Sequence, residues 1–99
     1  MRHGDRFEIR YTHEAVEDIR PLRAFDQRRV LDAIALHLSN EPTRLSKSRI
    51  KRMSQPFWSE YRLRVDDFRV YYDVDETQHV VQVLRVLFKG TGATPTESS

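Results

Sequence analysis

The chain has 99 residues, of which 38% are hydrophobic and 32% are charged, and this balance is typical of a small globular domain. It contains no cysteine, which excludes disulfide bonds, thiolate zinc sites and thiol nucleophiles. No apolar run approaches the roughly 20 residues of a membrane span, and the first residues form no apolar signal segment. We expect a soluble, cytoplasmic protein without a membrane partner, in which residues 1–89 form one domain and residues 90–99 a disordered polar tail.

In chain order, the first half predicts one strand and two helices. Residues 7–11 alternate apolar and polar side chains, as a half-buried strand does. Thr12 can cap the helix that follows, and Pro21 should end or distort it. Asp26 is the candidate cap of a longer amphipathic helix. The apolar stripe of this second helix consists of Val30, Leu31, Ile34 and Leu38.

The second half predicts a loop followed by three strands. Residues 44–56 have no clean period, so we expect a loop with a short turn. Residues 61–65, 68–74 and about 79–89 alternate or are strongly apolar, with short polar turns between them. The order β-α-α-β-β-β predicts an α+β fold, in which a helical hairpin packs on one face of a twisted, mainly antiparallel four-stranded sheet.

The strand alternation places one set of side chains opposite the core. This open face of the sheet should carry six basic residues joined by Tyr71, with only Glu8, Glu60 and Asp73 interrupting them. The six are Arg10, Arg62, Arg64, Arg69, Arg85 and Lys89. Guanidinium groups bind phosphate oxygens through paired hydrogen bonds, so the face favours an anionic partner.

The charge distribution along the chain agrees with this interpretation. Residues 44–69 contain eight Lys or Arg against three Asp or Glu, whereas residues 1–43 contain seven against eight. The basic segment adds Lys47, Arg49, Lys51 and Arg52 to the rim of the open face. The surplus predicts a nucleic acid or an acidic protein segment as the partner, although a solvated basic surface is the alternative.

Other chemistries have little support in the sequence. The four histidines, His3, His13, His37 and His79, have no metal-ligand spacing. No glycine-rich loop precedes a helix, so we expect neither a metal nor a cofactor. Trp58, next to Phe57, could stack on a base. The simpler interpretation of Trp58 is a hydrophobic plug where the loop enters the following strand.

Four segments together resemble the RelE/ParE superfamily of toxins from type II toxin–antitoxin systems. These segments are Tyr11–Ala15, Tyr61–Val65, Asp67–Asp73 and Val83–Val86. The resemblance implies a toxin neutralised by a cognate antitoxin, an acidic and partly disordered chain that folds on binding. Operator DNA would be bound only through that antitoxin. In the RelE branch the toxin enters the ribosomal A site and cleaves mRNA without a metal.

The resemblance also implies roles for residues of the open face. Cleavage needs a base, an acid and stabilisation of the charge on phosphorus. Arg69 and Lys89 match positions that would clamp the transition state, with Arg62 and Arg64 positioning phosphate. Tyr71 could transfer the proton, which makes Arg62, Arg69, Tyr71 and Lys89 the candidate catalytic residues. The candidate RNA-binding residues are Lys47, Arg49, Lys51, Arg52, Arg64 and Arg85.

The sequence departs from the RelE pattern at two places. The last ten residues contain no Tyr or His, where many RelE-type toxins carry a C-terminal Tyr or His, and Glu60 stands where some relatives place a catalytic lysine. Two alternatives therefore stay open beside the mRNA endonuclease. One is a ParE-like inhibitor of DNA gyrase, and the other is an attenuated toxin homologue that acts only with its antitoxin.

Overall fold

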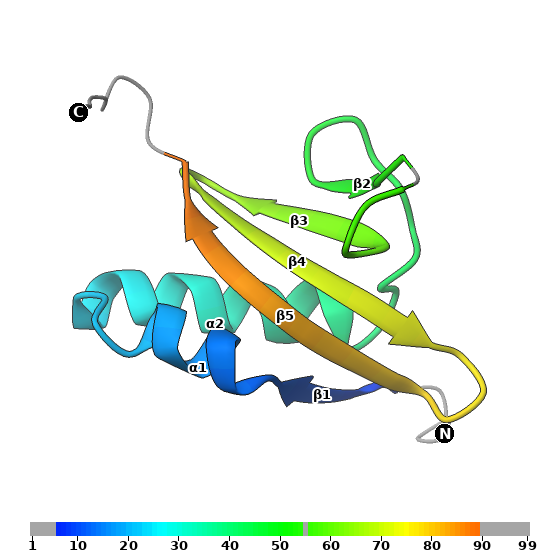
Figure 1. Cartoon of the computed structure of the whole chain (residues 1–99), viewed down its shortest axis with the longest axis horizontal. Coiled ribbons are helices and arrows are strands. Elements are labelled where there is room, and N and C mark those ends of the chain that lie inside the picture. The colour runs from blue at the N-terminus through cyan, green and yellow to red at the C-terminus, as the bar shows by residue number, and fades with distance from the viewer. Residues whose placement is uncertain (1–5, 55, 90–99) are drawn as a thin grey trace.

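A computed structural model describes residues 6–54 and 56–89. Seven elements follow one another, and they comprise five strands and two helices (Figure 1). They are β1 (Glu8–Tyr11), α1 (His13–Ile19), α2 (Ala24–Leu38), β2 (Ile50–Arg52), β3 (Tyr61–Val65), β4 (Phe68–Asp75) and β5 (Val80–Phe88). The polar tail predicted for residues 90–99 lies outside the described residues.

The strands form one mixed sheet in the order β1-β5-β4-β3-β2. Only β1 and β5 pair in parallel, and the other neighbours are antiparallel. This confirms the predicted α+β class and the mainly antiparallel sheet. Within the described residues, no helix is long and apolar enough to cross a membrane.

The sheet has five strands, so the prediction of four was wrong. The additional strand, β2, lies in the segment that we expected to be a loop. Its three residues pair with β3, Ile50 opposite Leu63 and Lys51 opposite Arg62. A strand this short carries no readable alternation, and its extended form is stabilised by the backbone of its partner. The strand β2 can therefore be recognised only in the folded structure, from its pairing with β3.

The N-cap of α1 is the residue that the sequence predicted, whereas the N-cap of α2 is a different one. The hydroxyl of Thr12 accepts a hydrogen bond from the Ala15 amide, as an N-cap does, and α1 ends two residues before Pro21. The predicted cap of α2 was wrong, because Arg23 occupies the N-cap and Asp26 lies in the first turn. The Asp26 carboxylate instead accepts a hydrogen bond from the Arg23 side chain.

The core lies between α2 and one face of the sheet. Val30, Ile34 and Leu38 of α2 are fully buried against strand residues such as Leu63 and Val70. Burying side chains of this size contributes about 1.5–3 kcal/mol each. This packing fixes which side of β3 and β4 faces inward, and so which side is left open.

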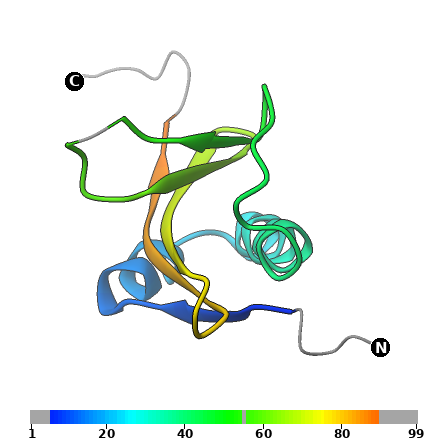
Figure 2. The same ribbon diagram turned by 90° about the vertical axis from the view of Figure 1, so that its right-hand side faces the viewer.

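The helix α1 occupies a different place from α2, along the edge of β5 (Figure 2). The first half of β5 is covered by β1, whose residues pair with Val80–Val83. A register irregularity at Tyr71 and Tyr72 follows in the pairing of β4 with β5. Beyond it, side chains of α1 and its cap cover the edge: the Thr12 hydroxyl donates to the Leu84 carbonyl at 2.9 Å, and the Asp18 carboxylate accepts from the Val86 amide at 2.9 Å.

Candidate nucleic-acid interface

Three arginines lie together on the open face of β3 and β4. We call Arg62, Arg64 and Arg69 the arginine cluster. Arg64 lies directly opposite Arg69 across the strand pair, and Arg62 lies opposite Tyr71. Their neighbours along the strands, including Leu63 and Val70, are fully buried on the other face. The alternation of β3 and β4 thus brings together the three arginines, as predicted from the sequence.

The cluster holds like charges close to one another. Burial, together with the charges of Arg64 and Arg62, lowers the pKa of Arg69. The Arg69 guanidinium donates hydrogen bonds to the carbonyl oxygens of Asp66 and Phe68, at 2.9 and 3.1 Å. Among the described residues, none of the three arginines forms an ion pair with a carboxylate. Like charges opposite each other on a sheet are destabilising, and a bound anion would relieve this repulsion.

The cluster has an unused hydrogen-bond donor. The Nε atom of Arg62 is buried and has no partner among the described residues. Two further basic residues border the cluster. Lys51 on β2 lies opposite Arg62 and is exposed, and Lys89 follows β5, with its amide bonded to the Asp67 carbonyl. The basic surface therefore continues to both sides of the arginine cluster.

Arg10 lies on the open face, as predicted, but at a distance from the arginine cluster: it is opposite Gln82 of β5, which is in turn opposite Asp73 of β4. Its guanidinium pairs with Glu8 at 3.1 Å, and it lines a hollow with Glu60 and Asp73 at the opposite end of the sheet. Burial and the nearby charge of Glu60 raise the pKa of Asp73, although the hydrogen bond from the Glu60 amide lowers it. The open face therefore has a basic end and an acidic end.

Arg85 is paired with a carboxylate, unlike the three arginines of the cluster, and its role in binding RNA stays a prediction. Its Nε and Nη2 atoms donate to the two carboxylate oxygens of Asp18, at 2.7 and 2.9 Å. Burial acts to raise the pKa of Asp18, but the hydrogen bonds from Arg85 and Val86 and the charge of Arg85 outweigh it, so this pKa is lowered. A single aspartate within a polar helix gives no sequence signal of such a contact.

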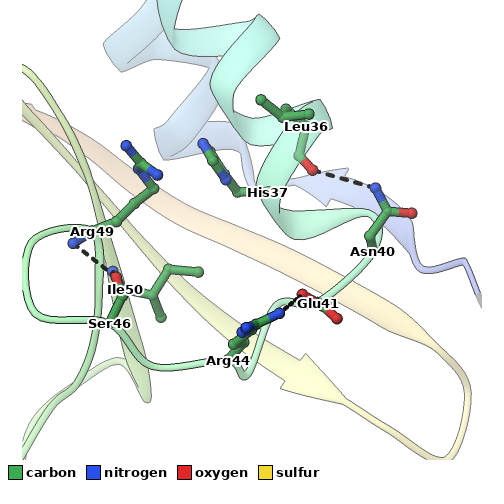
Figure 3. A pocket seen from close by; sticks show the side chains of 8 residues that line it. All are labelled: Leu36, His37, Asn40, Glu41, Arg44, Ser46, Arg49 and Ile50. Atoms are coloured by element: carbon green, nitrogen blue, oxygen red, sulfur yellow. Dashed lines mark hydrogen bonds and ion pairs between the residues drawn. The ribbon is translucent and has the colours of Figure 1, made fainter.

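Two residues of the predicted basic rim point away from the open face. Arg52 lies over the ring of Tyr61, 5.2 Å from its centroid, and Tyr61 belongs to the core. Arg49 lines a hollow with His37, between the end of α2 and β2 (Figure 3). Burial and the charge of Arg49 lower the pKa of His37. Of the other rim residues, Lys51 lies on the open face, whereas Lys47 is exposed in the loop before β2.

An aromatic cluster lies next to the arginines. Trp58 packs on Tyr71, with 4.8 Å between ring centroids, and Phe57 stacks on Trp58 at 5.0 Å. The Trp58 side chain is 51% exposed. The plug interpretation was therefore wrong, because Trp58 covers the outer side of the sheet instead of filling the core.

The described part of the chain offers no group of three His, Asp or Glu side chains placed to share a metal ion. What the open face offers is a set of guanidinium donors, a phenol at Tyr71 and exposed aromatic rings. These groups suit binding of a phosphate-bearing, single-stranded polymer.

The fold is that of a class of small toxins from toxin–antitoxin systems. Among solved structures, the chain is similar to the RelBE2 toxin–antitoxin complex of Mycobacterium tuberculosis, with 25% identity, a TM-score of 0.71, and 84% of this chain and 98% of that chain covered. It is also similar to the RelE–RelB complex of Pyrococcus horikoshii, with 23% identity, a TM-score of 0.69, and coverages of 87% and 98%. For the isolated E. coli RelE toxin the identity is 16%, the TM-score 0.66 and both coverages 88%.

The family is given by the sequence itself. A model of the family described as "ParE toxin of type II toxin-antitoxin system, parDE" matches residues 9–89. The chain therefore belongs to the ParE toxin family of type II toxin–antitoxin systems, within the RelE/ParE superfamily that its motifs resemble. A comparison with curated protein sequences gives no significant match.

Proposed function

We propose that this toxin inhibits translation by cleaving mRNA on the ribosome, without a metal, in the manner of RelE. The observation that carries the proposal is the arginine cluster, three guanidiniums on adjacent strands that form no ion pair among the described residues. A ribosomal site is lined with phosphate, and phosphate contacts dominate the affinity of proteins for nucleic acids. Because ribosomes are in the cytoplasm, the proposed site of action of this toxin is the cytoplasm.

The cleavage that this face would support is attack of an mRNA 2′-hydroxyl on the adjacent phosphorus. The 2′-oxygen loses its proton and bonds to phosphorus, and the 5′-oxygen leaves and takes up a proton. Fixed donors that face the developing negative charge lower the barrier. Arg69, which lies opposite Arg64 and two residues from Tyr71 along β4, would stabilise that charge. Arg62 on β3 and Lys89 after β5 would assist it from the two neighbouring strands. Tyr71 is the candidate for proton transfer.

We also propose a cognate antitoxin as the partner of this chain. The similar structure from Mycobacterium tuberculosis is a toxin–antitoxin complex, and the one from Pyrococcus horikoshii is a RelE–RelB complex. An acidic segment that folds on binding would neutralise the arginine cluster directly. Operator DNA would then be contacted only through the antitoxin.

The test is a cell-free translation reaction with the purified chain, followed by primer extension along the mRNA. We expect cuts with the wild type only when ribosomes are present. Arg69→Ala should abolish them, because it removes the central guanidinium while leaving the core intact. The matched control is Arg28→Ala, which removes an exposed arginine of α2. It should cleave like the wild type.

Intact mRNA with a folded wild-type chain would contradict the endonuclease. The second candidate is inhibition of DNA gyrase, and the match to the ParE family model over residues 9–89 favours it. In that case the chain would arrest growth and block gyrase supercoiling while mRNA stays intact. A chain that leaves both mRNA and growth untouched would be the attenuated homologue that acts only with its antitoxin.

A further inference from the structure

We propose that Phe57, Trp58 and Tyr71 form a platform on which one unpaired RNA base stacks while the arginine cluster holds the neighbouring phosphates. This inference rests on the proposed function and adds to it a binding site for the base. The three rings pack together, with centroid distances of 4.8 Å for Trp58 and Tyr71 and 5.9 Å for Phe57 and Tyr71.

The platform is exposed to solvent, although large aromatic side chains are normally buried in a folded protein. Trp58 is 51% and Phe57 37% exposed, although a tryptophan in a small protein is normally well buried. A shallow hollow lies beside Trp58 and is lined also by Leu84 and Arg85. Thr12 and Glu14 complete its lining, so Trp58 is the ring of the platform that has an open space beside it.

The backbone next to Trp58 is held firmly on the sheet. Ser59 is 2% exposed, and its hydroxyl donates to the Tyr61 carbonyl. The Glu60 amide donates to the Asp73 carboxylate at 2.7 Å, and the Met53 amide donates to the Glu60 carbonyl at 2.9 Å. A fixed aromatic surface loses little conformational entropy when a ligand stacks on it. The loop thus presents Trp58 ready for binding.

The position of the platform selects RNA over other aromatic ligands. Tyr71 lies opposite Arg62 and is two residues from Arg69 along β4, a rise of about 7 Å. A ligand on the platform is therefore next to guanidiniums that have no carboxylate partner among the described residues. Unpaired RNA combines a stacking base with phosphates at this spacing, and proteins bind it by pairing aromatic rings with basic side chains.

Trp58 is the single tryptophan of the chain, so the intrinsic tryptophan fluorescence comes from the platform alone. The experiment titrates the full chain, at low salt, with two oligoribonucleotides of equal length, about ten nucleotides. One carries its bases and the other has the same backbone without bases. Intrinsic fluorescence follows stacking on Trp58, and the anisotropy of a label on the RNA follows binding. We expect the RNA with bases to quench the fluorescence and to bind about 5- to 100-fold more tightly than the RNA without bases.

The variants separate the platform from the phosphate contacts. Trp58→Ala should make the two RNAs bind almost equally, and Trp58→Phe should retain most of the difference. Phe25→Ala is the matched control, since Phe25 is a 63% exposed aromatic residue of α2. It should bind like the wild type. Circular dichroism checks that each variant is folded.

Equal binding of the two RNAs by the wild type, without quenching, would overturn the platform while leaving phosphate binding intact. The same result is expected if the aromatic rings serve a contact with a protein. If neither RNA binds, the platform and the phosphate contacts of the arginine cluster are both overturned, whereas the proposed function is decided separately by the cell-free translation reaction.

Discussion

The contact between Asp18 and the edge of β5 should be a major local contribution to stability. Asp18 connects α1 to β5 across 68 residues of sequence, and its side chain is only 16% exposed. It accepts the Val86 amide at 2.9 Å and two hydrogen bonds from Arg85. Asp18→Ala removes all three acceptor contacts and leaves an amide of a half-covered strand edge without a partner.

The two partners of Asp18 should contribute unequally. A hydrogen bond to a charged group contributes about 1.5–3 kcal/mol, and an unsatisfied amide costs a similar amount. The Arg85 side chain is 40% exposed, so solvent screens its attraction and it should add little. We therefore expect Asp18→Ala to lower the free energy of unfolding by about 2–3 kcal/mol. In a domain of this size that corresponds to a fall in Tm of about 8–24 °C.

Urea and thermal unfolding of three variants test this reasoning. Asp18→Asn retains an oxygen for the Val86 amide and should lose less than Asp18→Ala, and Arg85→Gln should lose least. Glu17→Gln, on the same helix, removes one partner of a surface pair with Arg20 and is the control. If Arg85→Gln destabilised the protein as much as Asp18→Ala, the ion pair rather than the covered strand edge would be the source of the stability.

The pH dependence of the Asp18 contribution has a definite sign. The pKa of Asp18 in the folded chain lies below its ordinary value of 3.8. An acid with a lowered folded pKa stabilises the fold above its ordinary pKa, and this contribution is lost as the pH falls toward the folded value. The difference in stability between wild type and Asp18→Ala should therefore be constant from neutral pH down to about pH 5 and shrink below pH 4. A difference that grew on acidification would contradict the assignment.

Three further predictions concern the core and the basic face. Tyr72→Phe should cost about 1–3 kcal/mol in urea unfolding, because the buried hydroxyl donates to the Pro42 carbonyl at 2.6 Å; an unchanged midpoint would contradict this. Leu63→Ala, at a fully buried position, should cost about 2–5 kcal/mol by the same measurement. Binding of single-stranded RNA should weaken with salt with a slope of log K against log salt of about −2, and Arg64→Gln should reduce the slope by about 0.7; a slope near zero would mean that the cluster makes no phosphate contacts.

The sequence predicted which strand side chains face the core and which face away, because side chains on a strand alternate with a period of two. Leu63, Val70 and Val86 face the core, and Arg62 and Arg69 face away, as the alternation indicated. The cap at Thr12 and the buried stripe of α2 at Val30, Ile34 and Leu38 were equally local, since both depend on residues within one or two turns. Leu31, which was predicted to belong to that stripe, is 39% exposed, so the prediction was wrong at this position. The family motifs lie in these same segments, so the fold class could be predicted from the sequence.

The tertiary structure alone decided which basic side chains remain available. An arginine has a long side chain, and its guanidinium turns to a carboxylate or ring that folding brings near. Asp18 engages Arg85 across 67 residues, and the ring of Tyr61 engages Arg52. Three-residue β2 likewise exists only through its pairing with β3. Strand periodicity thus determined the face of the sheet to which each side chain is attached. Contacts between segments distant in the sequence determined where its charged group lies.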